Sequence, residues 1–191
     1  MLFVGLVGYG AYHAWDTRAV THGAGEIAPN IPQQRNLASA DAQNINGYQL
    51  TPLAKFSIEA RVLASKSYSF GREATLSPVD LALGWGPMSD EAVLNKIDIS
   101  QSNRFYFWHV DAFPIPREEI ETHSANMHMI PADGNIEQTL KSVRVGQVIN
   151  IEGYLIEAKS ADGWRWKSSL TRNDTGGGAC EVMLVKSIYV H

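Results

Sequence analysis

Cysteine is almost absent from this 191-residue chain, in which Cys180 is the only one. A single cysteine excludes an intramolecular disulfide and a zinc site built from cysteines alone. Because Cys180 stands at the start of an apolar run that includes Val182 and Leu184, we predict a small buried side chain in a strand. A thiolate nucleophile with a histidine base is the alternative interpretation.

An excess of positive charge is also lacking. The chain has 16 basic and 20 acidic residues and a formal net charge of −4. Residues 1–55 carry three of each sign, residues 56–119 carry six basic and nine acidic, and residues 120–191 carry seven and eight. Without a basic segment the sequence argues against a nucleic-acid partner and against recognition of anionic lipid by a polybasic stretch.

Charged side chains are missing altogether from residues 1–15, where apolar residues dominate. A helix of this length is about 22 Å long, which is shorter than a hydrocarbon core of about 30 Å. Continuing it to Val20 gives the required length and leaves Trp15 and Arg18 near the interface. We therefore predict an N-terminal hydrophobic helix, a membrane-inserting segment over residues 1–22 that contacts the membrane through residues 1–20. A buried N-terminal strand or helix is the alternative.

Apolar periodicity is absent from residues 23–54, which are rich in Pro, Gly, Asn and Gln. Such a composition buries too little surface to offset the entropy of ordering the chain. The sequence predicts a flexible tether here, followed by a β-rich globular domain over residues 55–191.

Within that domain, several short patterns predict secondary structure. Alternation over residues 56–62 predicts a half-buried strand, and the aromatic run 104–110 a second one. Ser77 followed by Pro78 is typical of a helix start, and predicts a helix through residues 81–83. Ser89 is the expected cap of another short helix over residues 92–94.

The last third of the chain predicts three long antiparallel strands, over residues 146–156, 164–170 and 179–190. Gly153 marks a bend in the first strand, and Asp162-Gly163 is a strong hairpin signal. We expect a fold of the α+β class that is mainly antiparallel β, with two or three short helices. A bent strand and the need to dispose of sheet edges favour a small closed or partly open barrel, similar to the oligonucleotide/oligosaccharide-binding (OB) type.

Three histidines, His109, His123 and His128, fall within twenty residues of one another. The five-residue spacing of His123 and His128 puts their rings on opposite faces of a strand and does not match the helical spacing of metal ligands. We predict no metal site and no cofactor. A hydrolase that uses His123, His128 and Cys180 stays open as the alternative to a non-enzymatic protein.

Trp164 and Trp166 alternate with Arg165 and Lys167, so the two indoles should share one face of their strand. They are either packing residues of the sheet or, with Arg165 and the nearby Arg172, a ligand-binding face of aromatic and basic side chains.

Four strings of the sequence resemble an uncharacterised group of bacterial proteins that have an N-terminal hydrophobic segment and a β-rich domain of unassigned activity. These strings are Leu81–Gly86, Glu121–His128, Trp166–Leu170 and Asp174–Glu181. The resemblance covers about residues 48–190. It implies a bacterial source and a single β-rich domain, and it implies no catalytic residue.

These observations predict a single-pass protein of the bacterial inner membrane. Its domain is expected to face the periplasm and to be a non-enzymatic binding or envelope-associated module whose partner is a protein or an envelope ligand. Arg18, which follows the hydrophobic segment, favours the opposite, cytoplasmic orientation.

Overall fold

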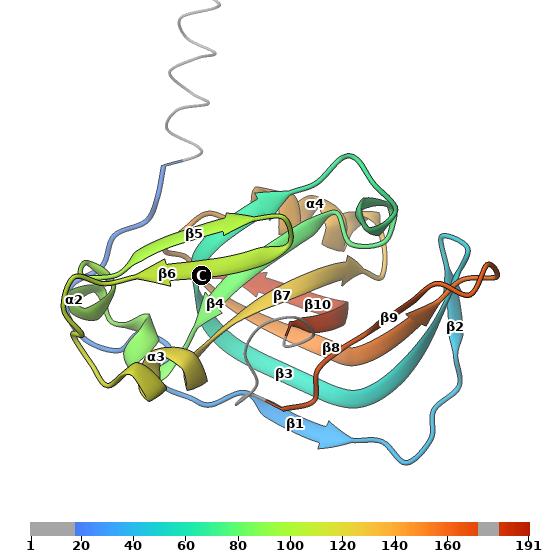
Figure 1. The fold of residues 1–191 in the computed structure, drawn as a ribbon, viewed down its shortest axis with the longest axis horizontal. Coiled ribbons are helices and arrows are strands. Elements are labelled where there is room, and N and C mark those ends of the chain that lie inside the picture. The colour runs from blue at the N-terminus through green and yellow to red at the C-terminus, as the bar shows by residue number, and fades with distance from the viewer. Residues whose placement is uncertain (1–17, 172–179) are drawn as a thin grey trace, which may run out of the picture.

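A computed structural model describes residues 18–171 and 180–191 (Figure 1). Its strands are β1 (Gln33–Asn36), β2 (Gln43–Ile45), β3 (Tyr48–Ser67), β4 (Val79–Gly84), β5 (Asp98–Ser102), β6 (Phe105–His109), β7 (Ser124–Pro131), β8 (Val148–Lys159), β9 (Arg165–Lys167) and β10 (Glu181–Val190). The helices are α2 (Glu91–Leu94), α3 (Arg117–Thr122) and α4 (Gly134–Ser142), with 3-10 turns at Glu73–Thr75 and Gly86–Ser89. The predicted β-rich domain with short helices is confirmed at this level. Residues 1–17 of the predicted N-terminal helix lie outside the described residues, and residues 18–22, to which the prediction extended the segment, are not helical.

Five strands form a ring-like sheet. The pairing runs β3–β4–β7–β10–β8, and β8 pairs with β3 again. Every pair in the ring is antiparallel except β7 with β10. The long strand β3 makes this closure because it pairs with β8 along residues 49–61 and with β4 along residues 61–67. The sheet is not a simple barrel, because β1 and β2 extend it beside β3 and β9 extends it beside β8.

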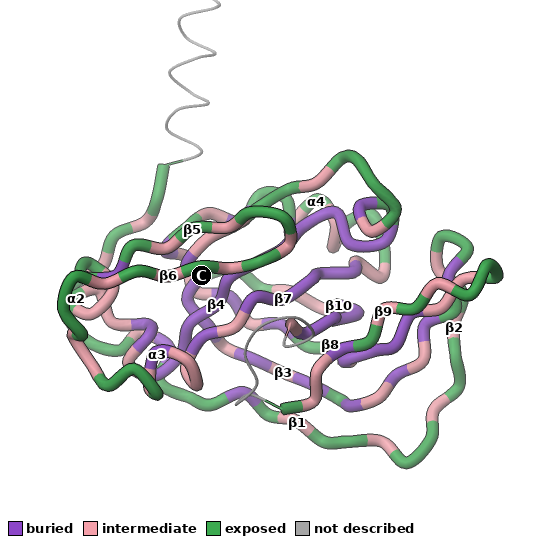
Figure 2. Tube along the Cα trace, in the orientation of Figure 1, coloured by how far each residue is buried: buried purple, intermediate pink, exposed green. Residues whose placement is uncertain are grey.

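The main core lies inside this ring. Figure 2 shows stretches of buried residues along the ring strands. Fully buried members include Leu81, Met127, Met129, Ile151 and Met183. Burial of each such side chain contributes about 1.5–3 kcal/mol relative to exposure, so the ring holds together through its interior.

A second layer covers the outer face of β4 and β7. The β5–β6 hairpin, α2 and α3 pack there around Ala82, Met88 and Ile120. Since β4 is covered on both faces, all six of its residues are buried. The same covering explains an error of the sequence prediction. Residues 79–84 form a strand and not the helix expected after Ser77-Pro78, because a strand buried on both faces shows a continuous apolar run without alternation.

Two other local predictions are corrected by the structure. Asp90, and not Ser89, caps α2, since its carboxylate accepts a hydrogen bond from the Ala92 amide. Gly163 has the positive φ expected of it (88°), but the turn it belongs to spans Ser160 to Trp164, longer than a two-residue turn. The return strand is correspondingly short, at three residues.

The predicted bend at Gly153 coincides with an irregularity in the partner strand, where the β8–β10 register shifts between Val185 and Ser187. A Cβ atom at Gly153 would lie 2.0 Å from the carbonyl oxygen of Leu184. Glycine is therefore required at this position because the backbone of β10 approaches it too closely for any side chain.

Residues 33–54, where the sequence predicts a tether, contain β1, β2 and the first part of β3 in the structure. Upstream of them, the Ala28 carbonyl accepts a hydrogen bond from the Gly86 amide. The polar side chains of β1 face outward, and its backbone satisfies its hydrogen bonds against β3. Strand pairing rather than side-chain burial orders this region, which is why its composition predicts a tether. Among the described residues, no helix is both long enough and apolar enough to cross a membrane.

Candidate ligand-binding site

A buried charged cluster lies on the outer face of β4 and β7. Asp80 and His128 are direct partners in the β4–β7 register, so their side chains emerge side by side. Oδ1 of Asp80 accepts a hydrogen bond from Nη1 of Arg104 at 2.6 Å and lies 3.0 Å from Nδ1 of His128. Nδ1 of His128 has no hydrogen-bond partner among the described residues, so this second contact is a close approach and not a hydrogen bond.

The turn between β5 and β6 carries Arg104 into this cluster. Asn103 and Arg104 are its two linking residues, with φ values of 51° and 69°. Positive φ at both positions is typical of a tight hairpin turn, but arginine is an unusual residue for the second one. The Arg104 amide donates to the Tyr68 hydroxyl at 3.1 Å, and its carbonyl accepts from Nδ2 of Asn126 at 3.0 Å. Arg104 at the hairpin tip is thus held by Asp80, Tyr68 and Asn126.

Aromatic rings continue the cluster into a row. The Arg104 guanidinium stacks over Tyr68 at 3.8 Å and lies 5.8 Å from the ring of Trp166. Trp166 is 4.6 Å from the His128 ring and 6.0 Å from Trp164. Both tryptophans are only partly buried, and they come from β9 and the residue before it. Solvent therefore reaches both indoles of the row.

The far end of the row repeats the same arrangement of cation, ring and carboxylate. Arg72 lies 5.5 Å over the Trp164 ring and pairs with Asp162, and Trp164 packs edge-on against Tyr48 at 5.4 Å. The hydrogen bond from Arg72 is the main reason that the pKa of Asp162 lies below its ordinary value. Each arginine of the row is thus neutralised by an aspartate.

Two further properties distinguish the buried end. Among the described residues, Oδ2 of Asp80 has no hydrogen-bond partner. Burial raises the pKa of Tyr68, and the charge of Asp80 adds to the rise, so the phenol stays protonated at neutral pH. The site offers a neutral phenol and the aromatic faces of the two tryptophans.

The structure brings together only part of the sequence-predicted ligand face. Trp164 and Trp166 share one face as predicted, whereas Arg165 pairs with Glu157. Arg172 lies outside the described residues. Asp80, Arg104 and Tyr68 were not predicted from sequence. The signal for them was weak, since Asp80 is a single acid within an apolar run and Asn103-Arg104 is an uncommon turn dipeptide.

The histidines and the cysteine lie in different surroundings. His109 is exposed at the end of β6, 3.7 Å from Asp111. Nδ1 of His123 lies 3.0 Å from the Glu119 carbonyl oxygen, so this ring is held by α3. Cys180 is partly buried, with its Sγ 3.9 Å from Nδ2 of Asn126.

A hydrolase therefore gains no support from the described contacts of His123, His128 and Cys180. Within residues 18–171 and 180–191, no three His, Cys, Asp or Glu side chains are grouped to hold a metal ion.

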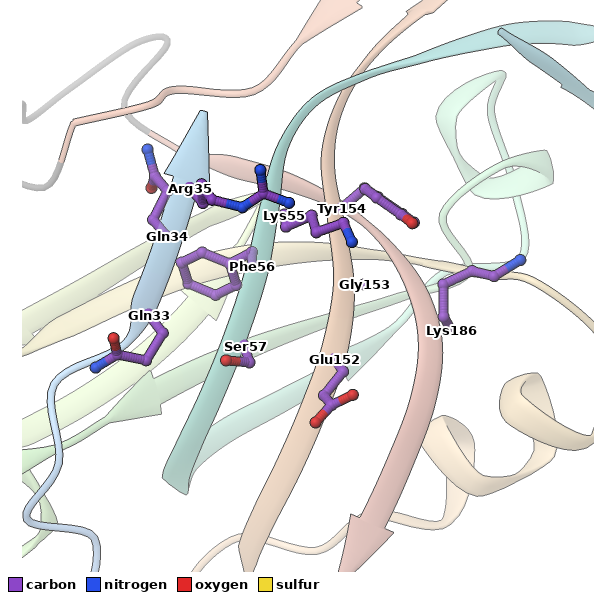
Figure 3. A pocket seen from close by; sticks show the side chains of 10 residues that line it. All are labelled: Gln33, Gln34, Arg35, Lys55, Phe56, Ser57, Glu152, Gly153, Tyr154 and Lys186. Carbon is purple, nitrogen blue, oxygen red and sulfur yellow. The ribbon is translucent and has the colours of Figure 1, made fainter. Parts of the chain in front are cut away.

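A shallow hollow of 440 Å³ lies elsewhere, on the outer face of β1, β3, β8 and β10 (Figure 3). Its lining residues are Gln33, Gln34, Arg35, Lys55, Phe56, Ser57, Glu152, Gly153, Tyr154 and Lys186. Figure 3 shows long polar side chains of β1 and β3 along it, with Lys186 apart on β10, beyond β8. These polar chains lack the stacked rings of the row beside Asp80.

No protein-family model, no curated protein and no solved structure matches this chain.

Proposed function

We propose that this protein is a non-enzymatic binding module, tethered to the inner membrane of a bacterium on its periplasmic side, that binds a glycan of the cell envelope. The observation that carries this proposal is the row of packed aromatic rings formed by Tyr48, Trp164 and Trp166, which Arg104 joins to Tyr68 beside Asp80 and His128.

The order of the ring strands supports placing the ligand on this row. Taken in chain order, the ring strands are β3, β4, β7, β8 and β10, and α4 lies between the third and fourth. We infer an OB-type fold from this connectivity, and in such a fold ligands bind on strands two and three and on the loops 1–2 and 4–5. Asp80 and His128 are on strands two and three, Tyr68 and Arg72 on loop 1–2, and the tryptophans on loop 4–5. Asp80, His128, Tyr68, Arg72 and the two tryptophans thus come from ligand-binding positions of that fold, whereas Tyr48 begins strand one.

The charge of the row favours a sugar over a nucleic acid. Arg72 and Arg104 are each paired with an aspartate, so neither contributes free positive charge to a phosphate. Indole faces bind the flat apolar sides of sugar rings through the same contacts that stack them on other flat groups.

Binding of soluble glycan and DNA to the full chain in detergent micelles tests the proposal. The probes are chitotetraose, a peptidoglycan glycan fragment and a single-stranded oligothymidine, and the readouts are tryptophan fluorescence and calorimetry. We expect a glycan probe to bind and Trp164→Ala to weaken it about tenfold, because one stacked ring is worth about 1–3 kcal/mol. Phe113→Ala is the matched control, since this ring is 54% exposed and packs on Trp108 away from the row.

Near-UV circular dichroism verifies that each variant is folded. If Trp164→Ala and Phe113→Ala bind a glycan equally well, the row is not the binding site. Binding of the oligothymidine alone would replace the glycan with a nucleic acid, and the absence of binding to all three probes would refute the glycan proposal.

A further inference from the structure

The chain is attached to the domain from Val20 onward. The Val20 amide donates to the Val145 carbonyl at 2.8 Å, and the Gly146 amide donates to the Val62 carbonyl. The contact is so close that a Cβ at Gly146 would lie 1.8 Å from the Val20 carbonyl oxygen. Nε2 of His22 also lies 2.7 Å from the Gly146 carbonyl oxygen. Val20 therefore has a fixed position beside the start of β8.

A second set of contacts holds the following residues, up to Ala28. The amides of His22 and Gly25 donate to Glu91 and Asp90, at 3.0 and 2.9 Å. Glu91 is itself held by an ion pair with the buried Arg61.

The amides of Ile27 and Ala28 both donate to Oγ of Ser89. We call residues 20–28 the docked segment. Because its amides bind side chains and backbone of the domain, it moves with the domain as one body.

The length of chain between the apolar run and the docked segment is short. Residues 16–19 separate Trp15, the last residue of that run, from Val20. Even fully extended, the five steps from Trp15 to Val20 span at most about 18 Å. A domain of this size is about 40 Å across. If the apolar run enters the bilayer, the domain cannot rotate freely above it.

We propose that the face around Val145 lies against the lipid bilayer. This inference rests on the membrane insertion of the N-terminal apolar run, which belongs to the proposed function; Val20 itself lies on the domain and outside the inserted part. Exposed apolar residues occur near the start of β8: Val145, three residues before it, is 40% exposed, and Tyr189 and Val190, which pair with Asn150 and Ile149, are 67% and 37% exposed. The His191 amide donates to the Val148 carbonyl, which places the end of β10 beside the start of β8. Tyrosine at this position suits the bilayer interface, where its ring is apolar and its hydroxyl is hydrated.

The opposite end of the molecule faces away from the lipid. Figure 1 places the start of the described chain toward the left and the β8–β9 turn at the far right. Ala161 is an exposed residue of that turn. It is therefore a control position whose distance from the bilayer the proposal predicts to be large.

Fluorescence quenching in vesicles measures these distances on the full chain. Single cysteines replace Val145, Tyr189 or Ala161 in a Cys180→Ser background, and each is labelled with an environment-sensitive fluorophore. The vesicles contain phosphatidylcholine and phosphatidylglycerol, with a fraction of lipids that carry a nitroxide quencher on the head group. A matched variant has a Gly/Ser insertion of about ten residues after Arg18, which lengthens the connection without changing the domain.

We expect quenching at positions 145 and 189 to be several-fold greater than at position 161, and the insertion to abolish most of that difference. Equal quenching at 145 and 161, in protein that floats with the vesicles, would overturn this inference and leave the membrane insertion standing. Protein that does not float with the vesicles would refute the insertion itself, and this inference with it.

Discussion

Replacing Arg104 with glycine separates two opposing contributions to stability at the tip of the β5–β6 hairpin. The substitution removes the partner of Asp80, a carboxylate whose side chain is only 1% exposed. Breaking a buried ion pair by removing one partner costs about 3–5 kcal/mol, because the remaining charge has no compensation. The lower part of this range applies, since the Arg104 side chain is 18% exposed and the His128 ring lies beside the carboxylate.

Glycine also relieves the backbone at this position. Arg104 has a φ of 69°, and positive φ in a residue with a side chain costs about 1 kcal/mol. We therefore expect Arg104→Gly to lower the free energy of unfolding by about 2–3 kcal/mol. Asn103→Gly is the matched control, because it relieves the same turn at the neighbouring residue and keeps the ion pair. It should leave stability unchanged or raise it slightly.

The measurement is urea unfolding of the full chain in micelles, followed by tryptophan fluorescence. Urea is preferred to guanidinium chloride, because guanidinium is the same chemical group as the side chain removed and can fill the vacated position. If Arg104→Gly and Asn103→Gly are equally stable, the Asp80–Arg104 pair contributes nothing net and our account of the cluster is wrong.

Two further substitutions test other parts of the fold. Gly163→Val should destabilise the fold by about 1–2 kcal/mol, because a β-branched residue resists a φ of 88°. A steric clash is not the cause, since a Cβ at this position would meet nothing within 4 Å. Ala161→Val in the same turn is the control, and equal melting temperatures of the two variants would contradict the backbone explanation. Burial raises the pKa of Tyr106 to about 12 from an ordinary value of 10.0. Between these pH values the unfolded chain loses the proton first, so wild-type stability should fall as pH rises from 10 to 12. Tyr106→Phe should show a shallower fall in melting temperature over this range, and parallel curves would show that the phenol makes no such contribution.

The sequence predicted best those parts of the fold that depend on local chemistry. Alternation identified part of β3, the aromatic run identified β6, and the apolar run after Cys180 identified β10. Gly153 and Gly163 were placed correctly at a distorted position and a turn, because glycine is selected there by backbone geometry. These signals do not depend on which segments meet later.

What the sequence did not predict depends on long-range pairing. The parallel contact of β7 with β10 has no local signature, and β4 was mistaken for a helix because both of its faces are covered. The candidate site follows the same rule. Trp164 and Trp166 were expected to share a face from alternation alone, whereas Asp80 and Arg104 meet across 24 residues at a turn that only the folded hairpin brings into place.

The length of β3 has a consequence for the time course of folding. Its residue Tyr48 precedes the first residue of β8, Val148, by 100 positions, yet the two strands form the longest pairing of the ring. Folding slows as contacts join segments that are far apart in sequence, because the entropy of closing the intervening loop is lost before the contact forms. During synthesis, β3 leaves the ribosome long before β8 exists, and until then one edge of a twenty-residue strand has no partner. Ring closure by β8 is therefore the expected slow step, and the nascent chain is most prone to aggregate while it waits for that strand.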